Sequence, residues 1–214
     1  MSQRPAPVRI EPKDLGDRLA AGALLVDCRD PRAFGAGHVA GSLNAWVDGP
    51  QFAERVSWFV PAGATLVLLA ETGADVARAV AALARVGLDD VAGYLTGTDA
   101  VRAAGLPAGA LPQVTPAALA QQLSEERDLL VLDVREPAEW ADGHVQGARH
   151  IPMRQVRARL DELPRDRRIA ITCAGGVRSS LVASMLLGQG FTDLVNVWGG
   201  MTGWVQSGLP TVRD

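Results

Sequence analysis

The feature that most constrains the fold of this chain is an internal repeat. Residues 26–41 align with residues 132–147 without a gap, at a constant offset of 106, and both stretches carry Asp-x-Arg followed by Gly-His-Val. Residues 87–107 align with residues 190–210 at an offset of 103. Self-similarity over this length predicts two copies of one domain of about 100 residues each.

Within each copy, short apolar runs alternate with stretches of helical spacing. The runs expected to form strands are residues 24–27, 65–70 and 91–95 in the first copy and residues 129–133, 168–172 and 194–197 in the second. Small helices are expected around Phe34 and Trp140, a longer helix after the middle strand, and a last short helix through Trp204. Strands alternating with helices predict an α/β fold, here two domains that each hold a small parallel sheet flanked by helices on both faces.

Proline marks the beginning of each copy and the join between them. Glu11-Pro12 and Thr115-Pro116 each precede a helical pattern, and threonine followed by proline is a favourable start for a helix. Residues 106–112 contain two prolines and one glycine, a composition typical of a linker. We expect a first domain over residues 1–107, a linker over about 108–112 and a second domain over 113–214.

Composition excludes several classes of partner. A net charge of −3 and scattered arginines argue against a nucleic-acid-binding surface. No apolar run approaches the roughly 20 residues that span a membrane, and the N-terminal residues lack the apolar core of a signal peptide. We therefore expect a cytoplasmic protein with neither nucleic acid nor membrane as partner, in which Cys28 and Cys173 are free thiols.

The chemistry is expected in residues 169–179. A buried strand leads into Cys173, the glycines Gly175 and Gly176, and Arg178, and a helix over residues 180–187 follows. A strand, a glycine-bearing loop and a helix N-terminus gather backbone N–H groups around one point, where they stabilise an anion. If that anion is the sulfur of Cys173, the cysteine is a nucleophile at neutral pH.

A lone cysteine is more often a buried structural thiol, so the neighbours of Cys173 decide the interpretation. An arginine beside an uncharged buried thiol would be costly, which favours the nucleophile. The spacing Cys-x4-Arg closes a tighter loop than the Cys-x5-Arg of phosphatases, which suits a sulfur atom carried on the cysteine. A phosphatase or arsenate reductase of the same fold is the less favoured alternative.

Together with three further motifs, this loop resembles the rhodanese sulfurtransferases, as a tandem pair over nearly the whole chain. The motifs are Asp133-Val-Arg135, Gly143-His144-Val-Gln-Gly147-Ala148 and Val197-Trp-Gly-Gly200 with Trp204. The loop is most similar to those of single-domain rhodaneses and of rhodanese domains fused to a metallo-β-lactamase-like persulfide dioxygenase. The histidine-rich metal motif of that dioxygenase is absent from the sequence, so dioxygenase activity is not expected here.

The resemblance implies transfer of a sulfane sulfur from thiosulfate or a small persulfide, such as glutathione persulfide, to cyanide or a thiol. Cys173 would carry the sulfur as a persulfide, without a metal or organic cofactor. The backbone of the loop would hold the persulfide and Arg178 would orient the donor. The substrate-binding residues implied in this way are Ala174, Gly175, Gly176, Val177, Arg178 and Ser179.

Supporting roles are expected for three further residues. Asp133 and Arg135 are interpreted mainly as an internal ion pair beside the active loop, and Trp198 as a packing residue that could wall the pocket. His144 resembles a structural position of the family. We do not expect Cys173 to pair with His144 or His150, because loop amides and the helix dipole can activate a thiol without a base.

The first copy is predicted to be catalytically inactive. Glu71 aligns with Cys173 and Val76 with Arg178, and the carboxylates of Glu71 and Asp75 would repel an anionic donor. Cys28 is no substitute, because it aligns with a valine, which indicates burial.

A different class of function stays open beside the enzyme. The chain could be a sulfur carrier that docks onto a partner, either a separate persulfide dioxygenase or a thiol-bearing protein, and never meets a free donor.

Overall fold

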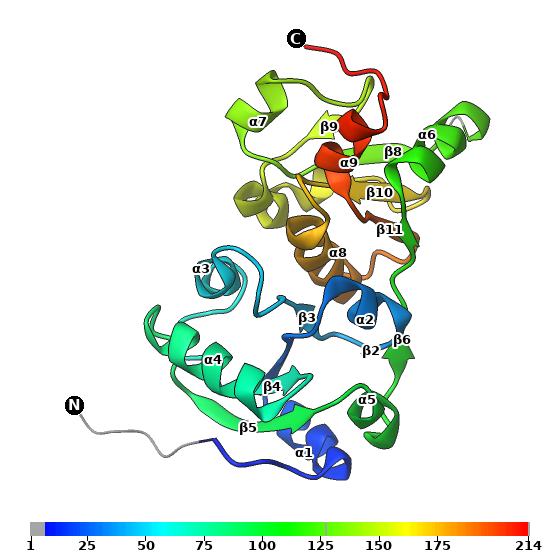
Figure 1. Ribbon diagram of the computed structural model, residues 1–214. Helices are drawn as coiled ribbons and strands as arrows, with labels where there is room; N and C mark the ends of the chain where they lie inside the picture. The colour runs from blue at the N-terminus through cyan, green and yellow to red at the C-terminus, as the bar shows by residue number, and fades with distance from the viewer. Residues whose placement is uncertain (1–6, 127, 214) are drawn as a thin grey trace. The chain divides into compact units, whose positions relative to one another are not determined.

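The computed structural model describes residues 7–126 and 128–213. The chain divides into two compact units, Met1–Ala110 and Leu111–Asp214, as the repeat predicts (Figure 1).

The first unit holds a parallel sheet of four strands in the order β3-β1-β4-β5. Its elements are η1 (Pro12–Asp14), α1 (Leu15–Ala20), β1 (Leu24–Asp27), α2 (Pro31–Ala36), β2 (His38–Val39), β3 (Leu43–Asn44), α3 (Phe52–Ser57), β4 (Leu66–Ala70), α4 (Gly73–Ala84), β5 (Val91–Thr96), α5 (Asp99–Ala103) and β6 (Ala108–Gly109).

The second unit holds a parallel sheet of five strands in the order β7-β11-β10-β8-β9. Its elements are β7 (Gln113–Val114), α6 (Pro116–Glu125), β8 (Leu130–Asp133), α7 (Pro137–Ala141), β9 (Arg149–His150), η2 (Met153–Glu162), β10 (Ile169–Thr172), α8 (Val177–Gly188), β11 (Leu194–Val197) and α9 (Gly200–Gln206).

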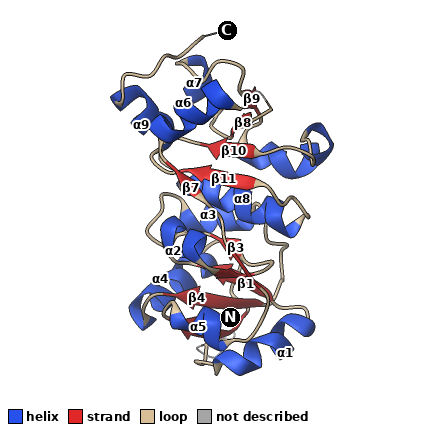
Figure 2. Cartoon of the chain, turned by 90° about the vertical axis from the view of Figure 1, so that its right-hand side faces the viewer, coloured by secondary structure: helices blue, strands red, loops and turns tan. Residues whose placement is uncertain are grey.

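These units confirm the predicted fold class, with helices flanking each parallel sheet (Figure 2). Every residue of β4 and of β10 is buried, which explains why both strands are continuous apolar runs rather than alternating ones. The predicted start of α6 is also confirmed, because the Thr115 hydroxyl accepts a hydrogen bond from the N–H of Ala118 at 3.2 Å.

The structure differs from the prediction where a linker was expected over residues 108–112. Ala108 and Gly109 form β6, which pairs antiparallel with β2, so that His38 lies opposite Gly109. The second unit has the matching bridge between His144 and Val212. The closing segment therefore belongs to the repeat. A glycine is needed there because a Cβ on Gly109 would lie 2.8 Å from His38 Nε2.

Within residues 7–126 and 128–213, no helix has both the length and the apolar character needed to cross a membrane.

Candidate active site

Cys173 lies where strand β10 ends, in the second unit. The strand is central in its sheet, between β8 and β11, and loop residues 173–176 connect it to helix α8. The side chain is 1% exposed. The carboxyl ends of parallel strands are where α/β folds place their chemistry, so the position agrees with that expected from the sequence.

Two hydrogen-bond donors of the loop and the first helical turn reach the sulfur. The N–H of Gly176 lies 3.1 Å from Cys173 Sγ, and the hydroxyl of Ser179 lies 3.4 Å from it. Of the predicted loop residues, Gly176 and Ser179 thus contact the sulfur directly. Hydrogen bonds donated to a sulfur stabilise negative charge on it.

The carbonyl groups of the loop are bonded to the segment around the end of β11 and the start of α9. The four bonds are from Met201 N to Cys173 O at 2.8 Å, from Thr202 N to Ala174 O at 2.9 Å, from Gly199 N to Gly175 O at 3.2 Å, and from Asn196 Nδ2 to Gly176 O at 3.1 Å. The C=O and N–H of a trans peptide point in opposite directions. Anchoring these carbonyls therefore turns the loop N–H groups toward the other side, where Sγ accepts the one from Gly176.

Gly200 permits this close approach of α9 to the loop. Its φ is +50°, and a Cβ there would lie 2.3 Å from Cys173 O and 2.6 Å from Ala174 O. Sequence reasoning used this glycine only as part of a family motif. Its physical role is to let two backbones meet.

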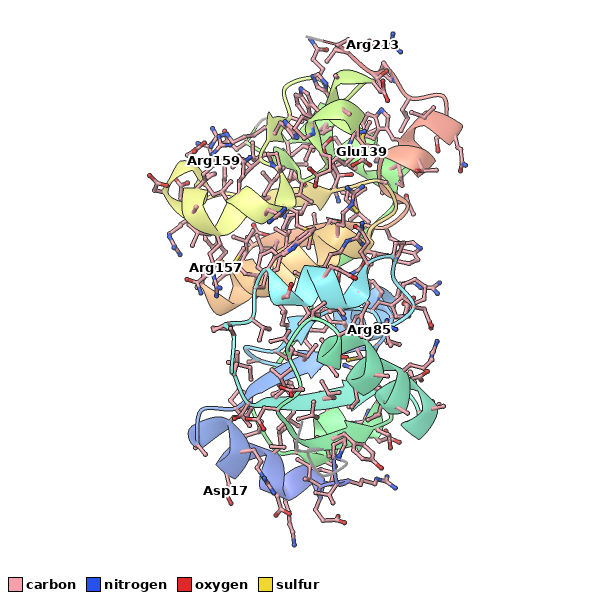
Figure 3. All side chains as sticks on the ribbon, turned by 90° about the vertical axis from the view of Figure 1, so that its left-hand side faces the viewer. Asp17, Arg85, Glu139, Arg157, Arg159 and Arg213 are labelled. Atoms are coloured by element: carbon pink, nitrogen blue, oxygen red, sulfur yellow. The ribbon has the colours of Figure 1, made fainter. Side chains whose placement is uncertain are left out.

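Arg178 binds Glu139, a residue that sequence reasoning missed. The guanidinium donates two hydrogen bonds of 2.6 Å, one to each carboxylate oxygen, in a part-buried pair. Glu139 is labelled in Figure 3. Burial alone would lower the pKa of Arg178, but the bonds to Glu139 and the nearby Cys173 raise it on balance. The pKa of Glu139 is lowered, chiefly by its hydrogen bond with Arg178.

The repeat held a signal that could have revealed this pair. Glu139 aligns with Ala33 and Arg178 with Val76. Both partners are missing from the first copy together, as expected of two residues that contact each other.

Asp133 and Arg135 form the predicted internal ion pair. Arg135 Nη2 lies 2.7 Å from Asp133 Oδ2, and both side chains are buried. The guanidinium also donates to Glu139 O at 2.8 Å and to Gly143 O at 2.9 Å. These bonds tie the end of β8 to the middle of α7 and to the residue that follows its C-cap.

The histidines of the second unit pack against Trp140. The rings of His144 and Trp140 stack with centroids 3.4 Å apart, and His150 stacks on the same indole at 4.7 Å. His144 Nδ1 lies 3.2 Å from Trp140 O, and His150 Nε2 lies 2.8 Å from Arg135 O. Both imidazoles thus contribute to packing and backbone contacts around α7.

Trp198 lies against the active loop. A Cβ on Gly176 would be 3.0 Å from Trp198 Cε3, and Trp198 N donates to Val114 O at 2.9 Å. Gly176 has a φ of +100°, so both its conformation and this contact favour glycine.

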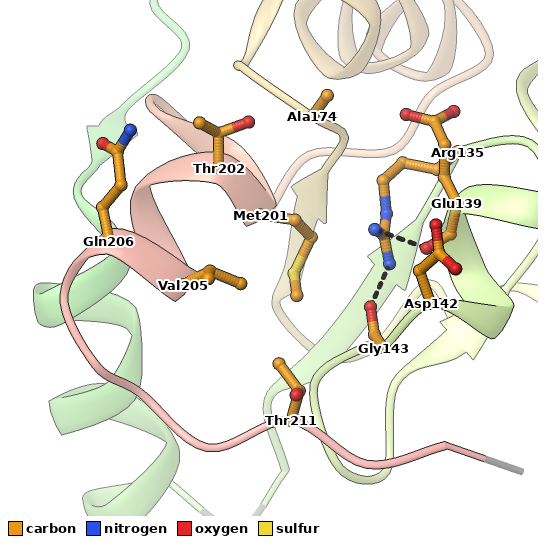
Figure 4. A pocket seen from close by; sticks show the side chains of 10 residues that line it. All are labelled: Arg135, Glu139, Asp142, Gly143, Ala174, Met201, Thr202, Val205, Gln206 and Thr211. Atoms are coloured by element: carbon orange, nitrogen blue, oxygen red, sulfur yellow. Dashed lines mark hydrogen bonds between the residues drawn. The ribbon is translucent and has the colours of Figure 1, made fainter.

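A cavity of about 450 Å³ opens beside the loop. It is lined by Arg135, Glu139, Asp142, Gly143, Ala174, Met201, Thr202, Val205, Gln206 and Thr211 (Figure 4). Ala174, which directly follows Cys173, belongs to this lining, so the cavity borders the active loop. The part of the chain that the structure describes contains no group of three or more His, Cys, Asp or Glu side chains placed to hold a metal ion.

The corresponding junction of the first unit is built differently. Helix α4 begins at Gly73, so only two residues separate it from β4, whereas four separate α8 from β10. The Thr72 hydroxyl accepts from Asp75 N at 3.2 Å, and Asp75 Oδ2 accepts from Thr72 N at 3.0 Å. This capping box occupies N–H groups that in the second unit lie at the loop.

Asp75 does not act as the repelling charge expected from the sequence. Arg78 binds both Asp75 and Asp48, and the pKa of Asp75 is lowered chiefly by its hydrogen bond with Arg78. The charge of Asp75 is therefore compensated. A shorter junction and a helix cap, rather than repulsion by Asp75, distinguish this unit.

Cys28 is buried, as predicted. Its side chain is 1% exposed, and Sγ lies 3.8 Å from Val26 O. Burial raises the pKa of this thiol, and the charges of Asp27 and Asp75 raise it further. A thiol held in its neutral form is a poor nucleophile.

Comparison with known proteins agrees with the repeat and the fold. The rhodanese-like domain family matches residues 11–104 and 115–207. A sulfurtransferase of Allochromatium vinosum is 36% identical over 100 residues, which are 47% of this chain and 94% of that protein. The thiosulfate sulfurtransferase GlpE of Glaesserella parasuis is 33% identical over 98 residues, covering 46% of this chain and 90% of GlpE.

Among solved structures, a rhodanese-like domain protein from Staphylococcus aureus is 34% identical, with a TM-score of 0.45, and the match covers 49% of this chain and 99% of that one. The two family matches together span most of the sequence. The chain therefore belongs to the rhodanese family and contains two rhodanese-like domains.

Proposed function

We propose that this protein is a rhodanese-type sulfurtransferase in which Cys173 carries the transferred sulfur as a persulfide. The observation that carries the proposal is the pair of donors at Cys173 Sγ, from Gly176 N and the Ser179 hydroxyl. They lie in a loop whose carbonyl groups are bonded elsewhere. Relatives named as sulfurtransferases support the general activity.

The reaction has two steps with a covalent intermediate. The Cys173 thiolate attacks the outer sulfur of the donor, so that an Sγ–S bond forms while the donor S–S bond breaks. Sulfite, from thiosulfate, or a thiolate, from a persulfide, leaves with the electron pair. A nucleophile such as cyanide then bonds to the outer sulfur and Cys173 leaves as a thiolate, without any metal or organic cofactor.

In this scheme the loop binds the intermediate. The N–H groups of residues 174–179 face the terminal sulfur and stabilise its charge. Arg178 is paired with Glu139, Trp198 lies against Gly176, and the Asp133–Arg135 pair holds the end of β8 in place. Cys173 is the catalytic residue and the others bind or position.

We assign catalysis to the second domain, over residues 113–214, and a non-catalytic role to the first, over residues 1–107. Glu71 stands where the second domain has Cys173, and the capping box of α4 takes the place of the open loop.

Intact-mass spectrometry tests the proposal. The protein is mixed with thiosulfate or with glutathione persulfide, beside the Cys173→Ser variant. We expect a gain of one sulfur, about 32 Da, that disappears on addition of cyanide and is absent from the variant. No gain from either donor would contradict the proposal.

Two further outcomes would replace the enzyme with an alternative. A persulfide that stays on Cys173 in the presence of cyanide and thiols would indicate a sulfur carrier. Hydrolysis of an aryl phosphate that depends on Cys173 would indicate a phosphatase.

A further inference from the structure

The guanidinium of Arg178, which is expected to orient the sulfur donor, is already paired with the carboxylate of Glu139. Arg178 donates to both oxygens of Glu139 at 2.6 Å, and its side chain is only 12% exposed. A bidentate arginine–carboxylate pair is among the stronger charged contacts in proteins. A small dianion such as thiosulfate must therefore compete with Glu139 for this guanidinium.

The other guanidinium at the cavity is engaged as well. Arg135 binds Asp133. It also donates to two backbone carbonyls, those of Glu139 and Gly143 (Figure 4). The exposed carboxylate of Asp142 lines the same cavity as Glu139. Arg213 donates a hydrogen bond to the backbone carbonyl of Asp142, not to its carboxylate, and Arg213 does not line the cavity. Because Glu139 is paired with Arg178, the charge that this lining offers to a ligand is the carboxylate of Asp142, which attracts an ammonium group and disfavours a dianion.

The size and lining of the cavity suit an organic group. Its volume of about 450 Å³ is in the range of small-molecule sites and much larger than a sulfonate needs. Met201 and Val205 offer apolar surface, and Thr202 and Gln206 offer hydrogen-bonding groups. An amino-acid-sized alkyl chain with polar ends matches this mixture.

We propose that the cavity binds the organic part of a persulfide derived from a small thiol that carries an ammonium group. Glu139 and Asp142 are the residues that determine this specificity, Glu139 by withholding Arg178 from dianions and Asp142 by attracting the ammonium group. The inference rests on the proposed sulfur transfer and names its donor class.

The proposed step is balanced. The Cys173 thiolate attacks the terminal sulfur of R–S–SH, the new Sγ–S bond forms, and the R–S bond to that sulfur breaks. The thiolate R–S⁻ leaves with the electron pair into the cavity, and Cys173–S–SH remains. No oxidant or reductant is consumed.

Comparison with the first domain indicates that the Glu139–Arg178 pair serves the reaction rather than the fold. The Asp133–Arg135 pair has its equivalent in Asp27–Arg29, whereas the Glu139–Arg178 pair has none, because Ala33 and Val76 stand in those positions. A contact confined to the copy with the cysteine is expected of a group that serves the reaction.

The experiment compares three donors by rapid-quench intact mass, which follows single-turnover loading of Cys173. The donors are thiosulfate, cysteine persulfide and the persulfide of N-acetylcysteine, which lacks the ammonium group. For each protein, the loading rate with cysteine persulfide is divided by the rate with N-acetylcysteine persulfide. The intrinsic reactivities of the two persulfides cancel when this ratio is compared between wild type and variant. We expect Asp142→Asn to reduce the preference for cysteine persulfide about fivefold.

Glu139→Gln removes the competing charge and keeps the shape of the side chain. We expect thiosulfate loading to rise about tenfold and cysteine persulfide loading to change less than threefold. Glu125→Gln, an exposed residue of α6, makes the same change in net charge and should leave all three rates unchanged. Equal responses of the three donors to Glu139→Gln, together with an unchanged persulfide ratio in Asp142→Asn, would overturn the inference.

The outcome separates this inference from the proposed function. Loading of wild type by any donor, with no shift of specificity in either variant, would leave sulfur transfer intact and refute the donor class. No loading by any donor would refute both. If Glu139→Gln unfolds in a thermal melt, Asp142→Asn decides the question through the persulfide ratio.

Discussion

The two strand–helix junctions of this protein follow equivalent strands of two separate sheets, and they differ in their use of backbone N–H groups. At the first, two residues join β4 to α4, and a threonine and an aspartate cap the helix. At the second, four residues join β10 to α8, and the loop N–H of Gly176 reaches Cys173 Sγ. Loop length and anchoring, more than the fold, therefore distinguish the domain with a candidate site.

The difference extends to the end of the last strand. Gly200 meets the carbonyls of the active loop, whereas around its equivalent in the first copy, Gly97, a Cβ would find nothing within 4 Å. Asn196 bonds to Gly176 O, whereas the first copy has Gly93 there. The second domain uses β11 and α9 to hold the loop open.

The largest effect is expected at the buried Asp–Arg ion pair that occurs once in each domain. Asp27→Ala and Asp133→Ala each leave a buried arginine without its carboxylate, so each should lower the free energy of unfolding by about 3–5 kcal/mol. Urea denaturation measures both. A loss at only one of the two sites would contradict the interpretation of these pairs as common structural elements.

The next largest effect is expected at Gly200, and the equivalent residue Gly97 serves as its control. Gly200→Ala would push α9 from the loop and should slow sulfur loading of Cys173 by about 100-fold. Gly97→Ala, its matched control, should cost only about 1 kcal/mol of stability for its positive φ. Single-turnover loading and thermal melts test the pair of variants. Normal loading in Gly200→Ala would show that loop anchoring is dispensable.

Asn196 should have a smaller effect, as a positioning residue. Asn196→Ala removes the bond to Gly176 O and should reduce the loading rate about tenfold while the donor concentration at half-saturation changes little. The split between rate and half-saturation separates positioning from donor binding. An unchanged rate would remove Asn196 from the account.

The pH dependence of the free energy of unfolding should differ between the wild-type protein and Glu139→Gln. The folded-state pKa of Glu139 is below its ordinary value of 4.5, so the pair with Arg178 stabilises the fold fully above that pH. The contribution is lost as the pH falls through the lowered folded-state pKa. Unfolding free energies of wild type and Glu139→Gln should therefore differ at pH 6 and converge in acid. A difference that grows in acid would have the wrong sign.

The smallest effect is expected from an attempt to convert the first domain. Glu71→Cys with Val76→Arg, made in a Cys173→Ser background, restores the two side chains without the longer loop. We expect no cyanide-sensitive sulfur gain by intact mass. A gain at position 71 would mean that side chains alone, not loop geometry, make the site.

Much of the fold was predictable because it depends on local patterns. The repeat, the buried strands, the cap at Thr115 and the burial of Cys28 all follow from spacing and composition. The strands β2, β3, β6, β7 and β9 were not predicted, since two residues carry no periodicity.

The surroundings of the site were less predictable. Glu139 and Arg178 are 39 residues apart in sequence and meet only through the order of the strands. The cavity depends on α9, whose contacts with the loop run through backbone atoms. At Asp75 the sequence held a readable signal, because Thr72-x-x-Asp75 resembles a capping box.

The most direct test of the account is to map the transferred sulfur onto the two cysteines. After loading, free and persulfidated thiols are alkylated, the protein is digested, and the peptides containing Cys28 and Cys173 are compared by mass. The account predicts the extra sulfur on Cys173 alone, with Cys28→Ser transferring sulfur at the wild-type rate. Sulfur on Cys28, or transfer that survives Cys173→Ser, would contradict it.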